Sequence, residues 1–469
     1  MRFWLLCLTL PSLTGCVAYH PQPLQPAQSE AQWRARSALD SGLAQWVGRH
    51  ETNAFHAWPP AQFDLTALTM VALYFHSDVQ LARAHVRSAQ AAEVTAGARP
   101  NPTLSVLPTG VASSFPDEPP FMMAVSLDVP IETAGKRSHR LAQARQATRA
   151  ARLALAEAAW AVRARLRAAL VEYFDAQKQS ELFQEDARLA EKSSALLAQR
   201  LAAGDISRFD LTIAQSETLN AQIALGAAQT RVAAARSALA AALGLTSPAL
   251  DQIQIAWPEF EQPPANFPLA PLQDAGLEHR LDVQRALAEY AGLEAALQLA
   301  IAGQYPDIHL DPGYEFDQGE HKFSLGPSIT LPLFDHNQGP IAEATAKRDE
   351  AAAAFLALQG DAINQMEMAE VTYRAAVAEW QTADRIAAAL RQHTEKSTER
   401  SVELGETDRG ALLQVRLQVS AAQRARLAAI RKVQDALGAL ENAVQHPLSE
   451  EADWQSLSQL VAQNPSPRP

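Results

Sequence analysis

The sequence predicts a mainly α-helical chain with a small β part, built as a duplicated half-protein. The duplication is visible in short matches about 200 residues apart: Asp-Val-Gln at 78–80 recurs at 282–284, and Val-x-Tyr at 171–173 recurs at 371–373. Both halves also share one order of elements: an amphipathic helix, two short alternating runs and two long alanine-rich segments. A period of this length is too long for a solenoid unit, so it indicates two related halves of one interlocked fold.

The expected segments follow this duplication, with two repeats of helix, two strands and two long helices. The predicted boundaries are 1–15 for a signal peptide, 16–62 for a lipidated N-terminal tether, 63–245 for the first repeat, 246–272 for a proline-rich linker, 273–446 for the second repeat and 447–469 for a C-terminal tail.

The N-terminus has the features of a secretory signal. A cationic Met-Arg start precedes an apolar run of about 11 residues, which suits a signal peptide and is too short to span a bilayer. The run ends at Leu-Thr-Gly-Cys, residues 13–16, which resembles the cleavage motif of bacterial lipoproteins. We therefore expect Cys16 to be acylated and to anchor the chain in membrane lipid. Val17, in place of Asp, favours the outer membrane; a plain signal peptide with a chance cysteine is the alternative.

The first repeat opens with apolar residues near helical spacing. They predict one helix over 63–98, ended by the Ala-Arg-Pro-Asn-Pro segment.

Alternating apolar and polar residues predict two strands in each half. The alternation is weak at 104–106 and clear at 123–131, 308–316 and 323–333, with a polar loop at 115–120. The clear runs are about ten residues long, the length of a transmembrane β-strand. One apolar face opposite a small or polar face is typical of a strand between lipid and water. An ordinary hairpin with one buried face gives the same pattern, so alternation alone leaves both interpretations open.

Each strand pair is followed by a very long helical segment and a returning helix. Residues 136–203 contain no proline or glycine, and 349–404 contain only Gly360. At about 1.5 Å per residue the first segment reaches roughly 100 Å. Leucines seven residues apart and frequent alanines indicate coiled-coil packing of closely spaced helices. The returning helices are expected at 209–243 and 411–443.

Composition and motifs argue against several functions. The formal net charge of −12 argues against a nucleic-acid partner. The histidines and cysteines show no metal-ligand spacing, and phosphate-loop and nucleophile motifs are absent. His309 and Asp311 share one strand face, but two ligands do not make a metal site. We expect no enzymatic activity, no cofactor and no resident metal.

Four strands cannot close a membrane barrel by themselves. The smallest transmembrane barrels have eight strands, and an open sheet edge is not tolerated in lipid. The strands of several subunits would therefore have to combine. Two subunits would give a barrel filled by its own side chains, whereas three give twelve strands and leave room for a pore.

Four segments carry a resemblance to a known family. They are Ala-Gly-Ala-Arg-Pro-Asn-Pro at 96–102, Pro-Ile-Glu-Thr-Ala-Gly-Lys-Arg at 130–137, Leu-Ala-Ala-Gly-Asp-Ile-Ser-Arg-Phe-Asp-Leu at 201–211 and Leu-Pro-Leu-Phe-Asp-His-Asn-Gln-Gly-Pro-Ile-Ala-Glu-Ala at 331–344. They resemble the TolC-type outer membrane factors, most of all their cobalt-zinc-cadmium efflux branch, over roughly 64–445. The resemblance implies a homotrimer with a 12-stranded transmembrane β-barrel and a long α-helical barrel through the periplasm.

The resemblance also places the periplasmic tips, where each half turns, at 204–210 and 405–411. We expect the tips to dock an adaptor and to gate the channel through seven residues: Gly204, Asp205, Ser207, Asp210, Gly405, Glu406 and Asp408. Some family members carry an aspartate ring just inside the second tip. The matching positions are Ala411 and Gln414, so that gate is absent in that form, and Glu406, Asp408 or Asp210 could substitute. Capping of the helices is the simpler role of these residues.

Polar residues on the strands are the candidate pore lining. They are Asp128, His309, Asp311 and Glu315. Such acids suit the passage of cations, but they are common in any wet lumen.

The leading interpretation is the outer membrane exit duct of a tripartite efflux pump for heavy-metal cations. The resemblance implies a periplasmic adaptor of the membrane fusion type and a proton-driven inner-membrane exporter of the resistance-nodulation-division type as partners. One alternative is a duct for drugs or a secreted protein. Another is a lipid-anchored periplasmic coiled-coil scaffold without a pore, which the duplicated strand pair argues against.

Overall fold

The computed structural model describes residues 17–48, 58–110, 121–262, 276–317 and 319–448. Its α-helices are α1 (Pro26–Arg34), α2 (Ser41–Gly48), α3 (Leu65–Phe75), α4 (Ser77–Gly97), α5 (Lys136–Ala202), α6 (Arg208–Leu243), α8 (Leu281–Ala302), α9 (Gln338–Ala389), α10 (Lys396–Glu403) and α11 (Arg409–Val444). Its strands are β1 (Thr103–Gly110), β2 (Phe121–Ile131), β3 (Ile308–Asp317) and β4 (Glu320–Ile329). Three short elements complete it: η1 (Ser247–Gln252), η2 (Pro258–Glu261) and the π-helical η3 (Leu390–Glu395).

Several predicted segments fall wholly or partly outside the described residues. They are the signal peptide, residues 16 and 49–57 of the tether, the loop at 115–120, residues 263–272 of the linker, residues 273–275 and 318 of the second repeat, and residues 449–469 of the tail.

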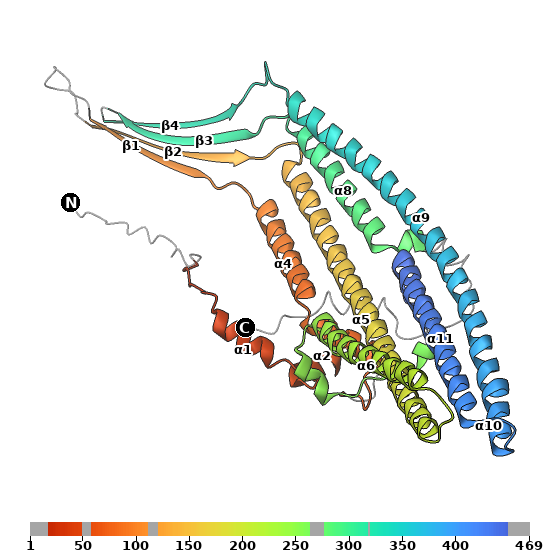
Figure 1. Ribbon diagram of the computed structural model, residues 1–469. Coiled ribbons are helices and arrows are strands. Elements are labelled where there is room, and N and C mark those ends of the chain that lie inside the picture. The colour runs from red at the N-terminus through yellow and green to blue at the C-terminus, as the bar shows by residue number, and fades with distance from the viewer. Residues whose placement is uncertain (1–16, 49–57, 111–120, 263–275, 318, 449–469) are drawn as a thin grey trace.

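The molecule is a curved layer of long helices with a sheet at one end (Figure 1). The long helices α5 and α9 run through most of the layer, α8 and α11 lie end to end between them, and α4 and α6 pack along α5. Where α8 and α11 meet end to end, Arg280, just before α8, donates a 2.6 Å hydrogen bond to the carbonyl of Ala443 near the end of α11. The predicted mainly helical, duplicated fold with a small β part is therefore confirmed.

The four strands form one antiparallel sheet in the order β1-β2-β3-β4. Each strand joins a helix, and the helices α4, α5, α8 and α9 lie side by side in the same order as their strands (Figure 1). The predicted alternation is confirmed in the register, because Val125 lies opposite Val106 and Tyr314, while Ser126 lies opposite Ser105. The sheet therefore has one apolar and one small or polar face.

The strand ends differ from the prediction. The weak first run at 104–106 belongs to an eight-residue strand, and the last run ends at Ile329 although its alternation continues to Leu333. Ile329 pairs with Ile308, the first residue of β3, so the residues after Ile329 have no partner on β3. The alternation in the sequence therefore continues beyond the paired part of β4.

The single helix predicted at 63–98 is wrong, because the chain breaks at His76 into α3 and α4. The backbone of His76 is extended (φ −67°, ψ 131°). Arg36, Gln80 and Arg83 donate hydrogen bonds of 2.7–3.3 Å to the last three carbonyl groups of α3. These side chains satisfy the carbonyls that a continuous helix would have bonded, so they stabilise the break.

The long helix predicted at 136–203 is confirmed by α5, but its counterpart at 349–404 is not continuous. It begins earlier, at Gln338, and it contains the π-helical turn η3 before α10. Such turns disturb helices locally without ending them. The hydrophobic period of the sequence does not reveal one extra residue in a single turn.

Parts of the expected tether and linker pack against the helices. Leu43 and Trp46 of α2 are buried, as are Trp257 and Phe260 of the linker. Their large apolar side chains join the hydrophobic cluster that contains α3 and the middle of α5. Together with α3, these parts of the tether and linker cover one side of the layer; α2, α3, η1 and η2 are hereafter called the belt.

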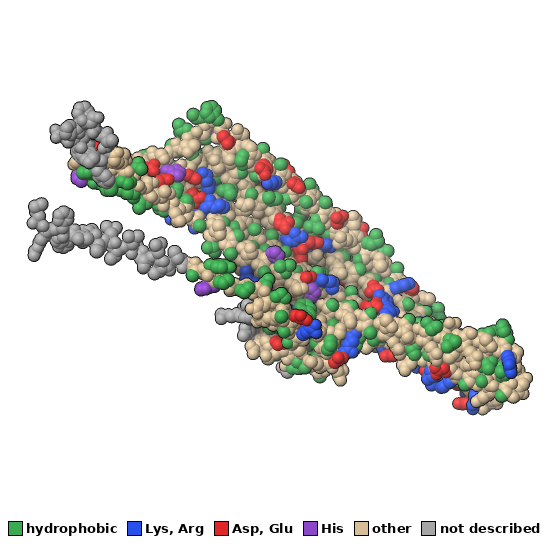
Figure 2. All heavy atoms as spheres, turned by 60° about the vertical axis from the view of Figure 1, so that its left-hand side comes forward, with side chains coloured by type: hydrophobic (Ala, Val, Ile, Leu, Met, Phe, Trp, Pro, Cys, Tyr) green, Lys and Arg blue, Asp and Glu red, His purple; other side chains and the backbone are tan. Residues whose placement is uncertain are grey.

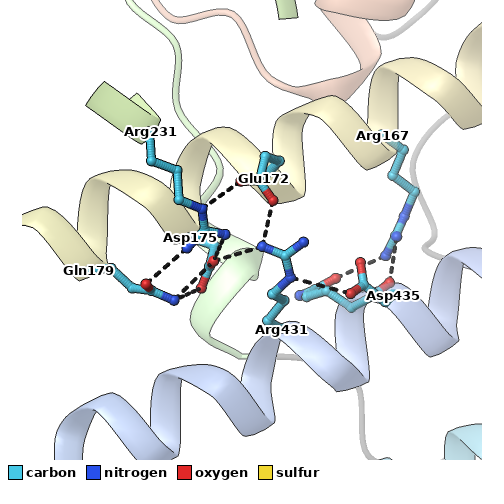
Figure 3. A network of polar contacts seen from close by, with 8 residues as sticks. Arg167, Glu172, Asp175, Gln179, Arg231, Arg431 and Asp435 are labelled. Carbon is cyan, nitrogen blue, oxygen red and sulfur yellow. Dashed lines mark hydrogen bonds and ion pairs between the residues drawn. The ribbon is translucent and has the colours of Figure 1, made fainter. Parts of the chain in front are cut away.

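A polar network joins three helices in the middle of the molecule (Figure 3). Asp175 of α5 is fully buried and accepts hydrogen bonds from Arg231 of α6 (2.6 Å) and Arg431 of α11 (2.8 Å). Glu172 pairs with both arginines, and Gln179 also donates to Asp175. Burial opposes the charge of Arg431, but the hydrogen bonds to Asp175 and Glu172 prevail and raise its pKa.

A second set of buried contacts continues this network. Arg167 donates to the carbonyl and the side chain of Gln434, and Gln434 donates to the carbonyl of Phe260 in the linker. Glu441 of α11 pairs with Arg163 and Arg167 of α5. The linker between the repeats is thus held where α5 meets α11.

None of the helices in the described parts of the chain is long and apolar enough to cross a membrane.

We expect Asp175→Asn to destabilise the purified protein by about 2–4 kcal/mol, because two arginines lose the buried charge that they share. The two arginines are about one third exposed, so solvent offsets part of the loss. The matched control is Asp435→Asn, since Asp435 is 54% exposed and pairs with Arg431 at 3.5 Å. Thermal unfolding should show a clear drop only for Asp175→Asn, and equal midpoints for the two variants would contradict a central role of Asp175.

Candidate functional site

The first tip joins α5 to α6 through a left-handed turn. Gly204 has φ +83°, and the N–H of Asp205 donates to the carbonyl of Arg200 at 2.9 Å, so α5 ends in a Schellman motif. Ser207 and Asp210 then form a capping box for α6: the N–H of Asp210 donates to Ser207 Oγ (3.2 Å) and the N–H of Ser207 donates to Asp210 Oδ2 (3.0 Å). Hydrogen bonds from Ser207 lower the pKa of Asp210.

The second tip repeats the turn but not the capping box. Gly405 has φ +76°, and the N–H of Glu406 donates to the carbonyl of Ser401 at 2.8 Å. Asp408 caps α11 by accepting a 2.8 Å hydrogen bond from the N–H of Ala411. Ala411 stands where the first tip has Asp210, so no carboxylate returns to the cap.

The two tips are connected to each other. Arg200, in the last turn of α5, lies 3.3 Å from Asp408 at the start of α11. Both side chains are substantially exposed, so the pair contributes at most about 1 kcal/mol. Sequence analysis missed Arg200, because its partner is more than 200 residues away and only the fold brings them together.

The predicted tip residues therefore divide by role. Ser207, Asp210 and Asp408 have capping bonds, the two glycines supply the left-handed turns, and Glu406 accepts a 3.1 Å hydrogen bond from Ser401 Oγ. Asp205 is exposed, and no described side-chain contact involves it. An added Cβ at Gly204 or Gly405 would meet nothing within 4 Å, so both turns are open to a partner.

The candidate pore residues lie on the polar face of the sheet. His309 Nδ1 and Asp128 Oδ1 are 2.7 Å apart across β2 and β3. Asp311 lies opposite Gly326, and Glu315 lies opposite Lys322. All four predicted residues thus share one face of the sheet. Asp128 and His309 are in contact, whereas Glu315 lies opposite Ala124, further along the strands.

A basic residue missed by the sequence analysis changes the charge of this face. Lys322 Nζ lies 2.6 Å from Asp317 and 4.0 Å from Glu315. It occupies the same parity of β4 as Ser324 and Ser328, so the strand pattern would have placed it on the polar face. The face is therefore acidic but partly neutralised at its far end.

Two further predictions concern the lipidation site and a metal site. Cys16, the expected lipidation site, lies outside the described residues. Among the residues that the structure does describe, no three His, Cys, Asp or Glu side chains gather where they could hold a metal ion.

The chain matches a known protein family in both of its repeats. The family model described as "Outer membrane efflux protein" matches residues 70–245 and 272–445. The chain is 31% identical over 264 residues to the cobalt-zinc-cadmium resistance protein CzcC of Cupriavidus metallidurans, a match that covers 55% of this chain and 60% of that protein. It is 29% identical over 180 residues to nodulation protein T of Rhizobium leguminosarum bv. viciae, covering 34% of each. The matches thus span less than two thirds of these curated relatives.

Solved structures share the fold at low sequence identity. The crystal structure of the Campylobacter jejuni CmeC outer membrane channel has a TM-score of 0.68 at 15% identity, covering 85% of this chain and 89% of that one. The outer membrane protein VceC of Vibrio cholerae gives 0.66 at 20% identity, with 82% and 97% covered. CusC gives 0.65 at 18% identity, with 84% and 95% covered.

Proposed function

Because the chain belongs to the outer membrane efflux protein family, we propose that it is the exit duct of a tripartite efflux pump and that heavy-metal cations are its substrates. The single observation that carries the substrate class is the 31% identity to a cobalt-zinc-cadmium resistance protein. The acidic polar face of the sheet is compatible with this substrate, since negative charge concentrates cations in a narrow passage. The duct does no chemistry, so energy comes from an inner-membrane exporter of the resistance-nodulation-division type.

A homotrimer would solve the problem of the open sheet. The edges of the sheet are β1 and β4, and its apolar face is exposed: the exposed fractions are 82% for Phe323, 71% for Leu325 and 65% for Leu104. Hydrophobic side chains are visible along the sheet at the left of Figure 2. Three copies would pair β4 with the next β1 and turn this face toward the lipid of the outer membrane.

The tips are the surfaces that we assign to a periplasmic adaptor. They end the helical layer opposite the sheet (Figure 1), and their turns present backbone and exposed acids rather than a pocket. Capping accounts for Ser207, Asp210 and Asp408. The adaptor would recognise the shape of the capped turns, together with the side chains of Asp205 and Glu406. Asp210, Glu406 and Asp408 would surround the periplasmic mouth of the duct.

We expect Ile329→Arg to reduce assembly in the membrane and Ser328→Arg to be tolerated. Ile329 and Ser328 are neighbours on β4 with opposite facing, and both are exposed in one subunit. A charge facing lipid costs about 2–4 kcal/mol at mid-bilayer and less near the interface, and Ile329 is the last residue of β4, so we expect a partial loss; a charge in a wet lumen costs little. The amount of trimer in isolated outer membranes measures the difference, and equal yields for the two variants would refute the facing of the sheet.

We expect loss of the chain to sensitise cells to cobalt, zinc and cadmium, and Gly204→Trp to fail to restore resistance. Tryptophan would obstruct the docking turn, while Gly204→Ala has the same unfavourable positive φ without the bulk and should restore resistance. The measurements are growth inhibition by each metal and crosslinking to the adaptor, for variants that reach the outer membrane as trimers.

Two results would contradict the proposal. Normal resistance and normal crosslinking with Gly204→Trp would show that the tip residues only cap helices and do not dock an adaptor. Sensitivity of the deletion strain to drugs but not to metals would assign the duct to another substrate class.

We expect a radiolabelled fatty acid to be incorporated into the wild-type protein and not into Cys16→Ser. The Leu-Thr-Gly-Cys motif motivates this expectation. Several acyl chains give durable anchoring where one is marginal. Label that persists in Cys16→Ser would reject this residue as the lipidation site.

A further inference from the structure

The sheet-side part of α5 has an unusual excess of positive charge. From residue 136 to 156 the sequence has six Lys or Arg residues and no Asp or Glu. The equivalent part of α9, 338–358, has two basic and three acidic residues. The whole chain has a net charge of −12, so this segment is a local exception in a negatively charged protein.

This charge is not explained by the stability of the helix. Cations near a helix N-terminus are unfavourable because of the helix dipole, and the first turn of α5 has no acidic residue. Two of the cations are neutralised locally: Lys136 lies 2.7 Å from Asp307 and Arg140 lies 2.6 Å from Glu132. The next three basic residues have no such compensation.

These three residues form the basic stripe, defined as Arg145, Arg149 and Arg152. Their spacing of four and three residues places them on one face of the helix, and all three are exposed. Among the described residues, no hydrogen bond or ion pair involving them is found, whereas most other arginines of the long helices have acidic partners. Their guanidinium groups are therefore available to a partner.

The basic stripe lies on the side of the layer that the belt covers further along α5. Arg145 and Arg152 are in heptad line with Ala159 and Leu166, both fully buried in the cluster that contains α3. The belt also contains α2, which the chain reaches from its N-terminus. If that N-terminus is lipid-anchored, as the proposed function holds, the belt side is the outside of the duct, because an anchored chain cannot pass through the wall.

The depth of the basic stripe decides between two kinds of anionic partner. At about 1.5 Å per residue, Arg145 lies roughly 14 Å and Arg152 roughly 24 Å along α5 from its start beside the sheet. The polar region of a bilayer is only about 5–8 Å thick on each side, and charges in physiological salt are screened over about 8 Å. Lipid headgroups next to the sheet therefore cannot reach most of the stripe.

We propose that the basic stripe binds a carboxylate-rich polymer of the periplasm with the chemistry of peptidoglycan stem peptides. Arginine is suited to this role because its planar guanidinium donates two parallel hydrogen bonds to one carboxylate. Three arginines over about 10 Å of helix engage successive carboxylates of an extended chain. This contact secures the duct laterally where it crosses the cell wall, and it rests on the outward facing given by the proposed function.

The test is cosedimentation of the full-length detergent-purified protein with purified peptidoglycan sacculi. The variant Arg145→Gln/Arg149→Gln/Arg152→Gln removes the stripe while keeping good helix formers. The control Arg385→Gln/Arg391→Gln/Lys396→Gln removes the same charge from exposed positions on α9, η3 and α10. Exposed ion pairs are individually weak, so the stripe variant should bind about 3- to 100-fold less tightly. The control should bind like the wild type, and high salt should weaken binding of the wild type.

Three results would overturn the inference. Equal losses in the stripe variant and the control would indicate non-specific attraction, and unchanged binding in both would make the stripe a solvated face. Thermal stabilisation by phosphatidylglycerol in micelles that is lost only in the stripe variant, with no loss of sacculus binding, would assign the stripe to lipid. Metal resistance tests the proposed function separately, because the sacculus assay involves no transport.

Discussion

The buried carboxylate of Asp175 is the constraint on which the helical layer depends. A charge without solvent exposure must be paired, and Asp175 is paired by arginines from α6 and α11, which belong to different repeats. The returning helices of both halves are thereby fixed against one helix, α5. A shift of α11 along α5 would separate Arg431 from its acids and Glu441 from its arginines, so the charges also set the register. The parts of α5, α6 and α11 between this junction and the tips therefore start from fixed relative positions.

The duplication has kept the architecture while exchanging the residues that hold it. In the first repeat Arg165 of α5 pairs with Asp78 at the start of α4. The equivalent of Arg165 in the second repeat is Gln365, and there Arg280 pairs with Asp282 instead, with Gln365 as a further acceptor. The aspartate keeps its place, whereas the arginine is supplied by α5 in the first repeat and by the residue just before α8 in the second. The pair in the second repeat is largely buried, so Asp282 needs the cation that Arg280 supplies, whereas the pair in the first repeat is half exposed and contributes little.

The sequence was sufficient where one period or one local motif decides the structure. The end of α5, the strand alternation and the glycine turns could be predicted because each depends on neighbouring residues. The break at His76 could not, since both sides are helical and the carbonyls are capped by side chains from elsewhere, such as Arg36. Arg200 and Lys322 were missed for a related reason: each is an ordinary surface cation until the fold supplies Asp408 or Asp317.

The tips show how capping limits what a functional residue can do. Asp210 accepts hydrogen bonds from the N–H and the hydroxyl of Ser207, and these bonds lower its pKa. Asp408 is similarly held by a backbone N–H and by Arg200. Neither carboxylate is free to change partner without loosening the helix it caps. The charges of Asp210 and Asp408 are therefore held in place at the tips by the caps. If the tips surround the mouth of the duct, as the proposed function holds, a partner that widened the mouth would move the capped helix ends together with their charges.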